Sequence, residues 1–103
     1  MSEPMFLQVL GKETPEVYSA QRGLFKALEE GSGLDAKTFQ LVYLGINAAY
    51  GQTGSVAAHA GLAKKAGATR EEVRGAVLVT LITSGARGLA ACLEAALDSY
   101  DNS

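Results

Sequence analysis

Cysteine, histidine and proline are all scarce in this sequence of 103 residues. The single cysteine, Cys92, excludes an intrachain disulfide and a metal centre built from cysteines. The single histidine, His59, lacks the further histidines or cysteines that would complete a zinc site. We therefore expect no metal and no other cofactor.

A strong net charge is also missing, because the formal net charge is −2 and no basic cluster stands out. Nucleic-acid binding needs such a cluster to neutralise phosphates. Asn47, Gln52 and Arg87 interrupt the apolar stretches, so none is long enough to span a membrane. The first ten residues lack the positive start and long apolar run of a signal peptide. We expect a cytoplasmic protein without nucleic-acid or membrane partners.

The two prolines, at positions 4 and 15, leave everything after Pro15 free to be helical. Apolar residues do not alternate over four or more positions, so we predict an all-α fold without a sheet. Cap and glycine signals divide one domain, residues 1–103, into about five helices. Caps included, these are expected at 14–31, 35–50, 52–66, 69–83 and 86–100, while residues 1–12 fit an extended arm.

Charged residues are absent from two long stretches, 38–63 and 75–86. Helices that are apolar nearly all round must be buried nearly all round, and five short helices cannot cover two or three of their own number. We expect other copies of the chain to supply the missing cover. The 17 alanine residues would let such helices approach closely. The sequence therefore predicts a homo-oligomer.

Polar residues inside the first charge-free stretch share helix faces. Gln40, Tyr43 and Asn47 are spaced i, i+3, i+7, and Ser55 and His59 are spaced i, i+4. A tight turn joins their helices, so the two stripes are expected to converge on an apolar-walled pocket for a small molecule. Plainer interpretations stay open: His59 as a hydrogen-bonded core residue, Ser55 as a cap, and the two amides satisfying each other or a backbone carbonyl.

The segment 37–72 resembles the carboxymuconolactone decarboxylase and alkylhydroperoxidase D-like family. The similar elements run from an Asp35-x-Lys37 helix start through Ala57-Ala58-His59 to the Glu71-Glu72-Val73 opening of the next helix. The resemblance implies an all-α, alkylhydroperoxidase D-like helical fold. It also implies assembly as a homotrimer or homohexamer, with the site near a subunit interface.

The redox branch of this family carries a glutamate, a Cys-x-x-Cys pair and a histidine. The matching positions here hold Gln40, Gln52, Ser55 and His59, so both sulfur atoms are missing. Peroxide reduction by that route needs one thiolate to attack and a second thiol to resolve the product. Cys92 lies in an apolar helix, where we expect it to be buried and unreactive.

The decarboxylase branch also lacks the cysteine pair, and resemblance to it implies proton transfer on a small organic acid or lactone. His59 would then be the catalytic acid or base. Arg87 would bind a substrate carboxylate or form an interface ion pair. The residues implied to line the pocket and bind substrate are Gln40, Tyr43, Gln52 and Ser55. Two alternatives stay open: a catalytically silent oligomeric binding module, and a peroxidase-like activity through Cys92.

Overall fold

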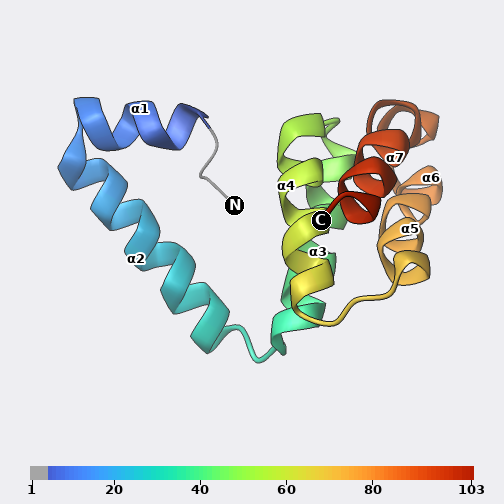
Figure 1. Ribbon diagram of the computed structural model, residues 1–103, viewed down its shortest axis with the longest axis horizontal. Helices are drawn as coiled ribbons and strands as arrows, with labels where there is room; N and C mark the ends of the chain where they lie inside the picture. Colours follow the sequence, from blue (N-terminus) through green and yellow to red (C-terminus); the bar gives the residue numbers. More distant parts are fainter. Residues whose placement is uncertain (1–4) are drawn as a thin grey trace. The chain divides into compact units, whose positions relative to one another are not determined.

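The structure is a computed structural model and describes residues 5–103. Every regular element in that range is a helix (Figure 1): α1 (Met5–Glu13), α2 (Pro15–Gly31), α3 (Ala36–Ala49), α4 (Thr53–Lys65), α5 (Arg70–Leu78), α6 (Thr80–Thr83) and α7 (Ala86–Asp101). The prediction of an all-α fold is confirmed. None of these helices combines the length and the apolar character that a membrane span requires. Contacts divide the chain into two compact units, Met1–Leu34 and Asp35–Ser103, which are described separately.

The first unit contains α1 and α2. The extended arm expected for residues 1–12 is wrong where it can be compared, because Met5–Glu13 forms a helix; residues 1–4 lie outside the described residues. Phe6, Val9 and Leu10 have the i, i+3, i+4 spacing of an amphipathic helix. The element is only about two turns long, and so short a pattern is easily taken for an extended segment.

The junction between α1 and α2 differs from expectation in one detail. Pro15 begins α2 as predicted, and its nitrogen, which has no hydrogen, interrupts the helical hydrogen bonds there. Thr14 was expected to cap α2 with its side-chain oxygen. Its hydroxyl instead donates to the carbonyl of Leu10, 3.2 Å away, so the chain turns from α1 directly into α2.

In the second unit, the predicted helix starts are confirmed. The Asp35 carboxylate accepts a hydrogen bond of 2.8 Å from the backbone N–H of Thr38, at the first turn of α3. This bond, the largest influence on the group, lowers the pKa of Asp35. At the start of α5, Thr69 and Glu72 form a capping box, in which each side chain accepts from the other's backbone N–H.

The turn between α3 and α4 sets how these two helices face each other. Gly51 has φ 71°, the left-handed conformation that favours glycine. Its N–H donates to the carbonyl of Ala48, and the N–H of Gln52 donates to the carbonyl of Asn47. This pair of bonds is a Schellman motif, which ends α3 and returns the chain at once into α4.

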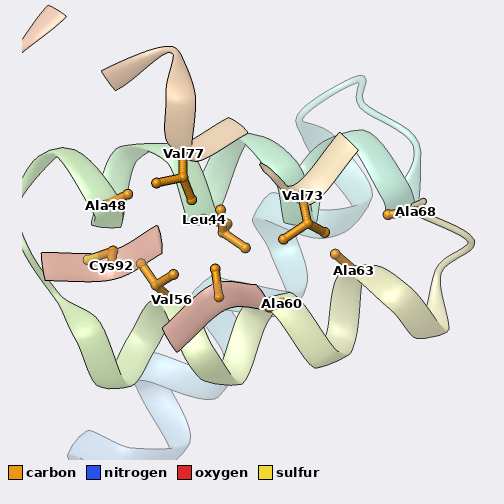
Figure 2. Packing of buried hydrophobic residues seen from close by; sticks show 10 residues of the cluster. Leu44, Ala48, Val56, Ala60, Ala63, Ala68, Val73, Val77 and Cys92 are labelled. Carbon is orange, nitrogen blue, oxygen red and sulfur yellow. The ribbon is translucent and has the colours of Figure 1, made fainter. Parts of the chain in front are cut away.

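The core of the second unit lies between α3, α4, α5 and α7 (Figure 2). Its buried side chains are mostly small: Leu44, Ala48, Val56, Ala60, Ala63, Ala68, Val73, Val77, Cys92 and Ala96. Small side chains let the helices approach closely, and Gly88 of α7 shows how closely. A Cβ atom added at Gly88 would lie 2.3 Å from the carbonyl oxygen of Ala48 on α3.

The described part of the chain has seven helical segments instead of about five. One addition is α1, and the other arises because the helix expected at 69–83 is divided at Val79 into α5 and α6. The break expected at Ser84-Gly85 is present, with Gly85 at φ 81° directly before α7.

Apolar side chains are exposed on one face of the second unit. A groove of about 370 Å³ between α3 and the α5–α6 segment is lined by Leu41, Val42, Gly45, Ile46, Ala49, Ala76, Val79, Thr80 and Thr83. None of these residues is charged, because the groove is built from the two charge-free stretches. Ile82 of α6, next to the lining residue Thr83, is 87% exposed.

Candidate functional site

His59 lies in the middle of α4 and contacts two side chains of α3. Its Nδ1 atom lies 2.6 Å from Oε1 of Gln40. Its ring stacks on the ring of Tyr43, with centroids 3.9 Å apart and planes inclined by 25°. Gln40 is buried, whereas Tyr43 and His59 are half-buried. The two polar stripes do converge across the α3–α4 turn, through these three residues.

A row of aromatic rings extends the site along α3. The Phe39 and Tyr43 rings lie 6.4 Å apart, inclined by 36°, and Tyr43 then meets His59. Phe39 was not among the predicted site residues, although its i, i+4 spacing from Tyr43 was a usable signal. Asn47 belongs to the same stripe, but its side chain donates to the Tyr43 carbonyl, 2.9 Å away. One of the plainer interpretations, an amide satisfying a backbone carbonyl, is therefore confirmed for Asn47.

The other predicted site residues are placed differently. Ser55 is half-buried one turn before His59, so the two share a face of α4. Gln52 is exposed at the start of α4, where its side chain makes no capping hydrogen bond. Arg87 is exposed in the first turn of α7. Within residues 5–103, no hydrogen bond or ring contact joins Gln52 or Arg87 to the His59 ring.

Burial determines the charge state of His59. Desolvation disfavours the imidazolium form and lowers the pKa of His59 from 6.5 to about 4. The stretch 38–63, which forms most of α3 and most of α4, contains no charged residue that would offset this effect. At neutral pH the ring is therefore neutral and can accept a proton.

Cys92 is fully buried on α7, as predicted, and its Sγ atom lies 4.0 Å from Oγ1 of Thr53. A metal centre has no obvious ligands in residues 5–103, where no group of three His, Cys, Asp or Glu side chains is placed to hold an ion. The side chains available for chemistry at the α3–α4 contact are the imidazole of His59, the phenol of Tyr43, the carboxamide of Gln40 and the hydroxyl of Ser55.

The fold and the site together define an all-helical protein with a half-buried histidine held between two helices of a tight hairpin. The chain belongs to the carboxymuconolactone decarboxylase family, whose model matches residues 15–98. This match begins with α2 and includes His59 and every predicted site residue. No curated protein and no solved structure matches the sequence.

Proposed function

We propose that this chain catalyses non-thiol proton transfer on a small organic acid or lactone, with His59 as the catalytic acid or base. The observation that supports the proposal most directly is the placement of the ring between Gln40 and Tyr43 in a charge-free part of the unit. A histidine is the side chain best suited to exchange protons near neutral pH. Ser55, one turn earlier on the same face of α4, offers a hydroxyl for binding a substrate oxygen.

The family name suggests a specific reaction, the decarboxylation of a carboxylated lactone. That reaction breaks the bond between carbon and carboxylate, releases CO₂ and leaves the bonding electrons on carbon. The carbon must then take up a proton. Because burial lowers the pKa of His59 to about 4, the free enzyme at pH 7 does not carry this proton on the ring.

A substrate carboxylate would change that state. A negative charge beside the ring favours the imidazolium form and raises its pKa. The ring would then take up a proton from water as the substrate binds, and pass it to the carbon after CO₂ leaves. The same imidazolium would balance the substrate charge in a stretch that contains neither lysine nor arginine.

The test uses the full chain with carboxymuconolactone and simpler carboxylated lactones, with CO₂ loss followed by mass spectrometry. We expect turnover by the wild type and at least a ~100-fold loss in His59→Asn, the usual scale for removing an acid–base group. Asn102→Ala, at the exposed end of α7, is the control for general effects of substitution. A folded His59→Asn variant with undiminished turnover would refute the catalytic role.

A second candidate function, a catalytically silent oligomeric binding module, is favoured by a separate observation. The uncharged groove between α3 and α5–α6, together with exposed Ile82, is an apolar surface of the kind that marks protein contacts. We propose that copies of this chain associate through it, as a homotrimer or homohexamer. Under this second function, a carboxylated lactone would bind without being converted.

Light scattering during size-exclusion chromatography tests the assembly. We expect the wild-type chain to be oligomeric, and Ile46→Asp or Ile82→Asp to shift it toward the monomer, because each would bury a carboxylate without a partner. Lys65→Asp, at the exposed end of α4, is the matched control with a new acidic residue elsewhere. A monomeric wild-type chain at micromolar concentration would contradict the proposal.

A peroxidase-like activity has less support. Cys92 is the single cysteine and is fully buried, so a resolving thiol from the same chain is missing. Peroxide-dependent oxidation of Cys92 in the folded protein would be the observation that revives this alternative.

A further inference from the structure

The contact between Gln40 and His59 restricts where the ring proton lies. The Oε1 atom of Gln40 is an amide oxygen, which only accepts hydrogen bonds. It lies 2.6 Å from Nδ1, so the hydrogen between them belongs to the ring. A neutral imidazole carries one ring proton, and its basic lone pair is then on Nε2.

We infer that Gln40 is a positioning residue that holds His59 in the Nδ1–H tautomer and so makes Nε2 the atom that exchanges the proton with substrate. This inference rests on the proposed function and deepens it. It also changes the role expected for Gln40 from the sequence: its amide oxygen is engaged by the ring and does not bind substrate.

Three features of the site fit this role. Gln40 is only 7% exposed, so water competes poorly for its amide oxygen. Tyr43 stacks on the ring face and opposes a rotation that would exchange the two nitrogens. Gln40 and His59 come from different helices, α3 and α4, whose relation is held by the turn at Gly51. The tautomer is therefore set by the helix packing.

The test exploits the single histidine of the chain. Nitrogen-15 labelling of histidine in the full chain yields ring signals from one residue, and these signals distinguish the two tautomers. At pH 7 we expect the wild type to be mainly Nδ1–H. Gln40→Met keeps the length of the side chain without a strong acceptor. It should raise the ratio of Nε2–H to Nδ1–H about fivefold or more, the scale of one hydrogen bond.

Two further variants separate positioning from packing. Gln40→Glu restores an oxygen acceptor, and its neutral ring should again be Nδ1–H. Because the carboxylate also raises the pKa of the ring, this variant is measured at pH 9, where the ring is neutral. Thr80→Val removes the hydroxyl of Thr80, a buried side chain on α6 that donates to the Val77 carbonyl. This control should lower stability without changing the tautomer ratio. With the lactone substrate, Gln40→Met should lower kcat more than it changes KM, and Gln40→Glu should recover part of the loss.

The inference is overturned if the wild-type ring is mainly Nε2–H, or if Gln40→Met leaves the ratio unchanged. Should Gln40→Met fail to fold, Gln40→Glu still decides, because a neutral ring that is mainly Nε2–H in that variant at pH 9 contradicts the role of the acceptor. The tautomer measurement needs no substrate. Failure of the proposed function, seen as undiminished turnover in His59→Asn, is therefore distinguishable from failure of the positioning role.

Discussion

Protonation of His59 should link the stability of this protein to pH in a definite window. In the unfolded chain the imidazole has its ordinary pKa of 6.5, whereas burial lowers the pKa of the folded ring to about 4. Between these values the unfolded chain binds a proton that the folded chain does not. The free energy of unfolding should therefore be fully retained above pH 6.5 and fall as the pH drops toward 4.

The size of the effect follows from the same two values. A lowering from 6.5 to about 4 corresponds to at most about 3 kcal/mol, of which about 2 kcal/mol would be lost by pH 5. Because the ring is only half-buried, solvent screening reduces the expected loss at pH 5 to roughly 1 kcal/mol. A change of this size is measurable in a domain whose total stability is roughly 5–15 kcal/mol.

Urea denaturation at several pH values between 5 and 8 measures this loss, with His59→Asn as the comparison. The asparagine amide does not titrate but retains an N–H that can donate to Gln40. Asp35, Glu72 and Asp101 have pKa values lowered by hydrogen bonds from Thr38, Thr69 and Arg70 respectively, so their contributions are lost at more acidic pH. Parallel losses in the wild type and in His59→Asn between pH 7 and 5 would refute the reasoning.

Three further predictions concern the fold. Gly88→Ala should lower the free energy of unfolding by about 1–3 kcal/mol in urea, because its Cβ would lie 2.3 Å from the Ala48 carbonyl oxygen; unchanged stability would contradict so close an approach. Thr69→Ala should cost about 1 kcal/mol by removing the cap of α5, and a thermal melt that matches the wild type would count against this contribution. Cys92 should react with a thiol reagent only as the chain unfolds, so rapid labelling of the native protein would show that the burial is wrong.

Helix starts and stops were largely predictable because they depend on neighbouring residues. Asp35, Thr69 and Gly51 act within one turn of their own positions, and the structure confirms all three. The predictions were wrong where a local pattern was short, as in α1, or fitted two hydrogen-bonding arrangements, as at Thr14. Thr14 can accept from the following turn or donate to the preceding one, and the presence of α1 makes the second choice available.

The charge-free stretches predicted burial, but they left open which face of each helix is covered by the same chain. Gly88 settles this for α3, because α7 packs directly against the Ala48 carbonyl. That approach depends on two residues 40 positions apart, and no pattern within one helix encodes it. The face of α3 that carries Leu41 and Gly45 is instead left partly uncovered and lines the apolar groove. This too results from how the helices pack.

The candidate site shows the same division between periodicity and packing. Helical spacing placed Gln40, Tyr43 and Asn47 on one face and Ser55 and His59 on another, and both groupings hold. Spacing along one helix contains no information about its rotation against the next. That rotation decides that the Gln40 amide meets the imidazole, while the Asn47 amide returns to the Tyr43 carbonyl of its own helix.

The same rotation decides the chemistry that the site can perform. With a neutral amide at Nδ1 and an aromatic ring on its face, His59 is held as a neutral base whose charge depends on what binds beside it. A carboxylate in place of Gln40 would instead raise the pKa of the ring and favour the imidazolium form at neutral pH. An anionic ligand should therefore bind with proton uptake near pH 6 and 7, and titration calorimetry in buffers of different ionisation enthalpy would measure it. Binding without proton uptake would mean that the ligand charge is met elsewhere and that His59 is not its counter-ion.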